Sequence, residues 1–216
     1  MPNIEGLIRD LDAVVVFRHV AECPVLRAFR ALGGDCGDGS PTALYSGFVT
    51  ELFRTHYNFS NFLLDAVAED ENRYVNLRSR GEEVPEVLRT CVEEELKLFQ
   101  QLSDLTAEEL QKYVHQRDVI RRTGFLPSFE TTKRDFAGAY EERIAKIRST
   151  GYGMYAHHTM FRLEGEEIVP ITSPDTRVLK DLYGYKHEKE QLLANTRALL
   201  DGKPAANTLL YGAAGT

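Results

Sequence analysis

Residues that could bind phosphate stand at the C-terminal end of the sequence. The short apolar run Asn207–Tyr211, NTLLY, leads into a stretch that opens with Gly212, GAAGT. A strand followed by such a loop aims successive backbone N–H groups at phosphate oxygens before the next helix begins. The complete pattern, G-x-x-x-x-G-K-[ST], also requires a second glycine, a lysine for the β- and γ-phosphates and a hydroxyl residue for Mg²⁺. The sequence reaches Thr216 before these three, so it predicts only the first part of a phosphate-binding loop.

Metal-binding and nucleophilic residues are few. His157 and His158 are adjacent, so on the strand predicted there they would face opposite sides and could not chelate one ion together. The three cysteines, Cys23, Cys36 and Cys91, match no zinc-binding spacing and suggest no disulfide framework. Cys91 falls close to the apolar side of a predicted helix, and we expect a small buried side chain there rather than a nucleophile.

Two further groups of side chains favour structural roles. Glu93, Glu94 and Glu95 are consecutive on a predicted helix and fan around it, which predicts a solvated face rather than a carboxylate site. An aromatic series at helical spacing is expected to be mostly core, with Tyr45 and Tyr57 reaching the surface through their polar tips. The members of this series are Tyr45, Phe48, Phe53, Tyr57, Phe59 and Phe62.

The composition is that of an ordinary folded protein with an acidic balance. The 216 residues include 26 Lys and Arg against 33 Asp and Glu, which gives a net charge of −7. Nucleic-acid binding needs clustered cations, so we expect no specific nucleic-acid partner, although a local basic patch at Arg117, Arg121 and Arg122 stays open. No apolar run reaches the roughly 18 residues of a membrane span, and the N-terminus lacks the basic start of a signal peptide. We therefore expect a cytoplasmic protein with no membrane contact.

Helical periodicity dominates from Pro2 to about Gly151. Thr106 with Glu109 three residues later forms a capping box, which marks a helix start. The segment His56–Asn61, HYNFSN, is expected to interrupt one long amphipathic helix, because Asn and Ser compete with the helical backbone. The predicted helical ranges are 4–20, 23–34, 41–69, 84–102, 105–117 and 129–150.

The pattern then changes to extended structure. Met154–Leu163 and Ile168–Ile171 stand on either side of the sequence EGEE, which predicts a β-hairpin. A linker, SPDTRVLKDLYG, follows, and the range 185–204 reads as an amphipathic helix that ends at Gly202 and Pro204. The strand-like run Asn207–Tyr211 comes after that helix.

These C-terminal elements together resemble a known family. The stretch DLYGYKHEKEQLLANTRALLDGKPAANTLLYGAAGT looks like the opening of an AAA-type ATPase domain, with an Asp-Leu-x-Gly element, a helix, a short loop, an apolar strand and a phosphate loop. It is similar, more narrowly, to the bacterial ATPase family catalogued as domain of unknown function 815. The specific match covers about Pro174 to Thr216, roughly a fifth of the chain, and the helical remainder agrees only in general plan.

The resemblance implies two groups of nucleotide-binding residues. The first part of the phosphate loop would be Gly212, Ala213, Ala214, Gly215 and Thr216, and the element against the adenine would be Leu182, Tyr183 and Gly184. ATP and Mg²⁺ are implied for a full-length parent protein. No cofactor is expected in this chain, because the phosphate-binding lysine and the Mg²⁺ hydroxyl are missing, so the chain itself is not expected to hydrolyse ATP.

The sequence thus predicts a mainly α protein in three parts: a multi-helix domain at 1–150, a β-hairpin and linker at 151–177, and a truncated start of an AAA-type nucleotide-binding domain at 178–216. The helical domain would serve client recognition or assembly, with the client unidentified. The apolar run 207–211 would lack sheet partners and offers a route to homo-oligomers through the C-terminal tail. The alternative is a stand-alone helical protein-interaction module without nucleotide chemistry.

Overall fold

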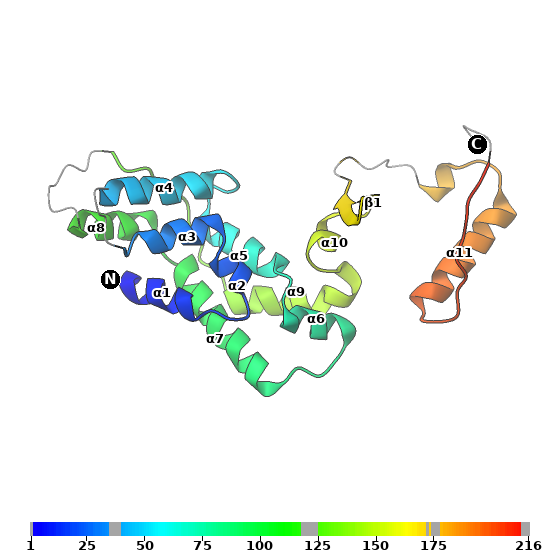
Figure 1. Cartoon of the computed structure of the whole chain (residues 1–216), viewed down its shortest axis with the longest axis horizontal. Coiled ribbons are helices and arrows are strands. Elements are labelled where there is room, and N and C mark those ends of the chain that lie inside the picture. The colour runs from blue at the N-terminus through cyan, green and yellow to red at the C-terminus, as the bar shows by residue number, and fades with distance from the viewer. Residues whose placement is uncertain (1, 35–39, 118–124, 172, 174–177, 213–216) are drawn as a thin grey trace. The chain divides into compact units, whose positions relative to one another are not determined.

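A computed structural model describes residues 2–34, 40–117, 125–171, 173 and 178–212 of the chain (Figure 1). These residues divide into two compact units, one up to Ile171 and the other from Thr172 onward. The protein is mainly helical with one small two-stranded sheet, which confirms the predicted fold class. In the part of the chain that is described, no helix combines the length and the apolar character that crossing a membrane requires.

The first unit is built from short and medium helices. Its elements are α1 Ile4–Asp10, η1 Leu11–Ala13, α2 Arg18–Ala21, α3 Pro24–Ala31, α4 Pro41–Phe53, α5 Phe59–Glu69, α6 Arg73–Arg80, α7 Glu86–Ser103, α8 Ala107–Arg117, α9 Phe136–Thr150 and α10 Met154–His157.

Local sequence signals account for where several of these helices begin and end. The capping box is formed: the Thr106 N–H donates to Glu109 Oε2 at 2.9 Å and the Glu109 N–H donates to Thr106 Oγ1 at 3.3 Å. The predicted interruption is confirmed, because α4 ends at Phe53 and Asn58 caps a new helix by accepting from the Asn61 N–H at 3.0 Å. Gly81 ends α6 with a φ of 70°, a left-handed conformation that glycine adopts without strain.

Aromatic side chains form the centre of the core of this unit. Phe48 is fully buried, and its ring centroid lies 5.7, 5.3 and 5.7 Å from those of Phe29, Phe59 and Phe129. Helix α4 packs beside α3, and α7 packs against α1, α5 and α9, as their neighbouring ribbons in Figure 1 show. The core therefore joins segments from Ile4 to Ile147 into one cluster of buried side chains.

Several sequence predictions in this unit were wrong in part. The helix predicted at 4–20 is divided, because residues 14–17 are not helical, and the helix predicted at 129–150 begins only at Phe136. Helix α6 was not predicted, although Tyr74, Val75 and Leu77 on its inner face are buried. Tyr45 was expected at the surface, but it is fully buried and its hydroxyl donates to the Pro127 carbonyl at 2.7 Å. A polar tip can thus be satisfied inside the protein by a carbonyl from a distant loop. Tyr57 is 69% exposed, as predicted.

The β-hairpin is shorter than predicted. Strands β1, Phe161–Glu164, and β2, Glu167–Pro170, pair antiparallel with Leu163 opposite Ile168. Gly165 makes the turn with a φ of 63°. The range Met154–His157, predicted to be part of the first strand, is helix α10, and His158 follows as its C-cap. The expectation that His157 and His158 face opposite sides of a strand is therefore wrong, because His157 ends a helix and His158 is its C-cap.

The second unit contains a short helix, a long helix and a returning tail. Its elements are η2, Leu179–Asp181, and α11, Lys186–Leu200. After Gly202 the chain turns and runs back along α11 (Figure 1). None of the described residues of this unit is buried. A second region of the chain thus has regular structure without a core of its own.

Candidate functional site

The residues predicted to contact adenine form an exposed turn ahead of α11. Leu182 is 49% and Tyr183 94% exposed. Gly184 and Tyr185 have φ values of 75° and 52°, so two consecutive left-handed residues redirect the chain into the helix. Tyr185 is the one non-glycine residue with positive φ among the described residues, a conformation that costs free energy unless local structure supports it. Lys189 helps to hold this turn, because its Nζ donates to the Leu182 carbonyl at 2.6 Å.

Of the predicted phosphate loop, only Gly212 falls within the described residues. Ala213, Ala214, Gly215 and Thr216 lie outside them. The preceding run was predicted to be a strand, and this is not what the structure has: Asn207–Tyr211 has no strand assignment. A strand needs the backbone of a neighbour to hydrogen-bond with, and the described tail has a helix beside it instead. Leu209, Leu210 and Tyr211 are 82%, 72% and 92% exposed.

One side chain that the sequence analysis did not single out fixes the course of the tail. Asn195, in the middle of α11, donates through Nδ2 to the Ala206 carbonyl at 2.7 Å and to Thr208 Oγ1 at 3.0 Å, and its Oδ1 accepts from the Ala206 N–H at 2.9 Å. An asparagine inside a helix is an unfavourable choice for helix formation, which is the signal that could have identified it. Asn195 thus holds residues 206–208 against α11.

The tail that leads to Gly212 runs toward the turn predicted to contact adenine. The turn at Leu182–Gly184 precedes the first residue of α11, and the tail runs from Asn195 back toward that same end of the helix (Figure 1). At this end of α11 the described residues expose the aromatic ring of Tyr183.

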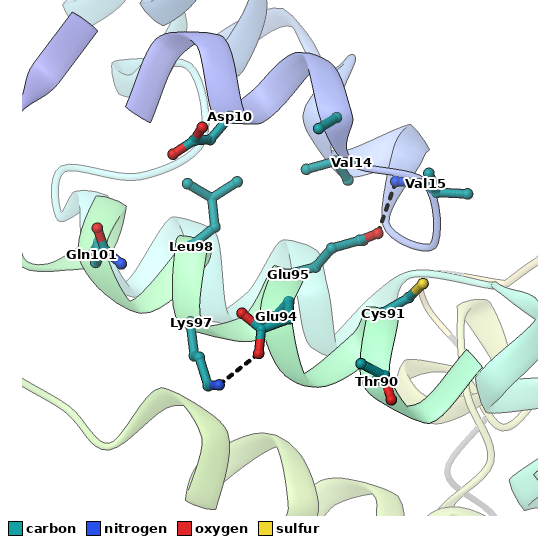
Figure 2. A pocket seen from close by; sticks show the side chains of 11 residues that line it. Asp10, Val14, Val15, Thr90, Cys91, Glu94, Glu95, Lys97, Leu98 and Gln101 are labelled. Carbon is teal, nitrogen blue, oxygen red and sulfur yellow. Dashed lines mark hydrogen bonds and ion pairs between the residues drawn. The ribbon is translucent and has the colours of Figure 1, made fainter. Parts of the chain in front are cut away.

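A different concave site lies in the helical unit. A cavity of about 450 Å³ lies between residues 10–15 and one face of α7. Figure 2 shows the side chains that line it. Asp10, Val14 and Val15 form one wall, and residues of α7 form the other. A second cavity of about 290 Å³ adjoins it, since both are lined by Asp10 and Gln101. The two cavities together form a groove along α1, η1 and α7, called the α1–α7 groove below.

The α1–α7 groove corrects the prediction for the three glutamates of α7. Glu93 and Glu94 are exposed as expected, but Glu95 is only 8% exposed. Its carboxylate accepts hydrogen bonds from three consecutive backbone N–H groups: Val15 at 2.8 Å, Val16 at 3.0 and 3.1 Å, and Phe17 at 2.9 Å. Charged acceptors make the stronger hydrogen bonds of proteins. Glu95 therefore attaches the loop before α2 to α7 and supplies the acceptor for three consecutive backbone donors.

Two other α7 side chains line the α1–α7 groove. Cys91 was expected to be buried, but it is half-buried and borders the cavity, so it is accessible from one side. Lys97 Nζ donates to Glu94 Oε1 at 2.7 Å, and this hydrogen bond raises the pKa of the Lys97 ammonium (Figure 2). The Lys97 ammonium in the groove is thus already paired with the carboxylate of Glu94 on the same helix.

A buried acidic side chain, Asp70, lies at the C-terminal end of α5. Asp70 is 7% exposed, and its Oδ2 accepts from Asn72 Nδ2 at 2.8 Å. The exposed ring of His19 approaches the other carboxylate oxygen at 3.7 Å. Burial is the main cause that raises the pKa of Asp70, and it also raises the pKa of the nearby Tyr140 hydroxyl.

The remaining candidates are the possible basic patch and the potential metal ligands. Arg117 donates to the Gly34 carbonyl at 2.6 Å and to the Tyr113 hydroxyl at 2.8 Å, whereas Arg121 and Arg122 of the possible basic patch lie outside the described residues. Within the described part of the chain, no group of three or more His, Cys, Asp or Glu side chains could hold a metal ion.

The fold and these sites define a mainly helical protein with a small hairpin and a C-terminal unit that carries a glycine-rich end. Residues 155–216 match a family described as Protein of unknown function (DUF815). The match covers β1, β2, η2, α11 and the tail, and it supports the narrower resemblance, to that family, drawn from about Pro174 to Thr216. No curated protein and no solved structure matches the chain.

Proposed function

We propose that this chain is the N-terminal part of an ATP-binding, AAA-type ATPase, in which the helical unit serves client recognition or assembly. The observation that carries the proposal is the exposed apolar tail, Leu209–Tyr211, which leads directly into Gly212. The family match at residues 155–216 supports the same assignment.

The physical argument starts from the apolar surface of the second unit. Leu199 and Leu200 at the end of α11 are 67% and 80% exposed, and the tail leucines are exposed to the same degree. Full burial of a leucine side chain is worth roughly 1.5–3 kcal/mol, so a segment that leaves several in water is far from its most stable arrangement. An apolar run between two turns is typical of a strand covered on both faces in a parallel sheet. The remaining strands of such a sheet would bury these residues.

Two features prepare this segment for nucleotide binding. The Asn195 hydrogen bonds fix residues 206–208, so that the chain enters Gly212 from a defined direction. The left-handed turn at Gly184 and Tyr185 leaves the Tyr183 ring exposed for contact with a flat base. ATP and Mg²⁺ would be bound by the longer protein, and the 216 residues alone would be inactive because the loop lysine that contacts the β- and γ-phosphates is absent.

The test begins with the gene downstream of the Thr216 codon. Codons for Gly-Lys-Ser or Gly-Lys-Thr are expected there, and a protein expressed through that reading frame should bind Mg-ATP in a calorimetric titration. Replacing Gly212 by Val should weaken binding by about tenfold, because a side chain at this position blocks the close approach of backbone to phosphate.

The matched control for this substitution is Gly47→Ala. An added Cβ at Gly47, in α4, meets no atom within 4 Å, so Mg-ATP binding should be unchanged. A stop codon after Thr216, or equal binding by the Gly212→Val variant and the unsubstituted protein, would refute the nucleotide assignment.

The second candidate function is a helical protein-interaction module without nucleotide chemistry. The observation that favours it is an exposed aromatic pair on the first unit: Phe53 is 38% and Tyr57 69% exposed, with ring centroids 5.3 Å apart. Aromatic side chains are enriched at interaction hot spots. Client capture that is lost in a Tyr57→Ala variant, together with no ATP binding by the extended protein, would establish this alternative.

A further inference from the structure

The face of α7 that borders the α1–α7 groove carries a repeating pattern. Its residues recur at spacings of four, three, four and three, an average of 3.5, and they are Val87, Cys91, Glu94, Leu98 and Gln101. Residues that recur every 3.5 positions lie on one face of a helix and can contact a partner helix along its length. We call this row of five residues the seam. Cys91, Glu94, Leu98 and Gln101 line the cavity, and Val87 one turn earlier is 78% exposed. Leu98 is only 9% exposed and belongs to the groove floor. The accessible positions of the seam are Val87, Cys91, Glu94 and Gln101, which span about 21 Å of helix at a rise of roughly 1.5 Å per residue.

The floor and walls of the α1–α7 groove are apolar in part. Ala13, Val14 and Leu98 line it, and Val15 on the far wall is 72% exposed. The Val15 backbone is fixed by its hydrogen bond to Glu95, so this exposed side chain is held at the groove edge by a buried anchor (Figure 2). An exposed valine on a rigid backbone offers apolar contact at little cost in conformational entropy.

The charge of the α1–α7 groove is negative. Asp10, Glu94 and Asp104 line its two cavities, and the one lysine that lines them, Lys97, is engaged by Glu94. No ion-pair partner for Asp10 or Asp104 is found among the described residues. The fourth carboxylate, Glu95, is occupied by backbone N–H groups. A groove that has exposed valines at its edges and two carboxylates without an ion-pair partner in the described part of the chain, Asp10 and Asp104, complements a surface with apolar and cationic side chains.

We infer that the α1–α7 groove binds a basic amphipathic helix of a partner protein, with the partner's apolar stripe over Val15, Val87 and the groove floor and its Lys or Arg side chains at Asp10, Glu94 and Asp104. This inference rests on the recognition role proposed for the helical unit, and it is independent of the nucleotide assignment. The helix-in-groove mode reads a partner at positions i, i+3, i+4 and i+7, which matches the spacing of the seam.

The test uses the whole 216-residue chain and two synthetic peptides of 14 residues with the same leucine positions. One peptide has Lys at every polar position and the other has Glu. Fluorescence anisotropy should show binding of the Leu/Lys peptide and at least about tenfold weaker binding of the Leu/Glu peptide. The double variant Asp10→Asn, Glu94→Gln should bind the Leu/Lys peptide about fivefold more weakly, since exposed ion pairs contribute modestly.

A matched control separates this groove from the general acidity of the protein. Glu83 and Glu93 are exposed and do not line the groove, so Glu83→Gln with Glu93→Gln removes the same charge and should change the affinity less than twofold. Alkylation of Cys91, followed by mass spectrometry of its tryptic peptide, should slow when the Leu/Lys peptide is bound. Neither substituted carboxylate of the groove bonds a backbone donor, so circular dichroism should be unchanged.

Several outcomes would overturn the inference. These are equal affinity for both peptides, equal loss in the groove and control variants, or unchanged alkylation of Cys91 at saturating peptide. Sedimentation that shows a dimer, lost in the groove variant, would mean that a second copy of this chain occupies the groove instead. Mg-ATP binding by the extended protein is measured separately, so failure of peptide binding leaves the nucleotide assignment standing and the reverse also holds.

Discussion

The two units of this chain differ in how much of their apolar side-chain surface is buried. The helical unit buries a continuous cluster from Ile4 to Ile147, with Phe48 and Phe59 at its centre. The described residues of the C-terminal unit bury none, and Leu200, Leu209 and Tyr211 are among the most exposed apolar side chains of the protein. The first unit therefore supplies its own stability, whereas the second has helices and turns whose apolar surface is expected to be covered by further structure.

The largest effect expected from this difference concerns one large side chain in each unit. Phe48→Ala should lower the free energy of unfolding by about 3–5 kcal/mol, because it leaves a cavity among three other rings. Leu209→Ala should change it by less than about 0.5 kcal/mol, because the side chain is already in water. Urea unfolding followed by far-ultraviolet circular dichroism measures both. Comparable losses in the two variants would mean that the tail has a buried partner in this chain.

The next effect tests the buried carboxylate of the helical unit. Glu95→Gln replaces one acceptor oxygen with a donor that faces backbone N–H groups, and it should cost about 1.5–3 kcal/mol of unfolding free energy. The neighbouring exposed residue provides the control: Glu93→Gln should cost less than about 0.5 kcal/mol. If both variants unfold at the same urea concentration as the unsubstituted chain, Glu95 does not anchor the loop before α2.

These two glutamates also show what the sequence could and could not predict. Helix starts with local signals, such as Thr106 with Glu109 and the break before Asn58, were predicted and are confirmed. The burial of Glu95 depends on donors about 80 residues earlier in the chain, and no local pattern reports such a contact. Consecutive glutamates look alike in sequence, and only tertiary packing distinguishes them.

The same limit applied elsewhere. Helix α6 has eight residues and a polar composition, so its periodicity is too short to outweigh its charges. Met154–Leu163 is predicted as one extended stretch, but the paired strands begin at Phe161, opposite Pro170, and Met154–His157 is helical. In the C-terminal unit the sequence identifies the apolar run Asn207–Tyr211 but not its conformation. A segment becomes a strand only where another strand pairs with it through backbone hydrogen bonds.

The smallest effect is expected from the pH dependence of the helical unit. Burial raises the pKa of Asp70, so folding favours the protonated form of this carboxyl group. The contribution of Asp70 to stability is therefore present below the ordinary carboxyl pKa, and it is lost as the pH rises through the higher pKa of the folded protein. Asp70→Asn keeps an acceptor for Asn72 without the buried charge. It should therefore stabilise the protein at pH 7, with a gain that shrinks toward pH 4.

Unfolding measured between pH 4 and pH 7 checks this dependence. Asp104→Asn, a substitution at an exposed carboxylate, should show no comparable trend. A destabilised Asp70→Asn variant at pH 7 would indicate that the ion pair with His19 outweighs the cost of burial.

Hydrogen exchange of residues 206–211 tests the central claim most directly, in the 216-residue chain and in the protein expressed through its downstream reading frame. We predict rapid exchange at Leu209, Leu210 and Tyr211 in the 216-residue chain, with Ala206 slower because its N–H donates to Asn195. In the longer protein the same three amides should be strongly protected, since they would lie inside a sheet, and Mg-ATP should increase that protection. Equal and rapid exchange in both proteins would contradict the claim that this tail is a strand of a nucleotide-binding domain.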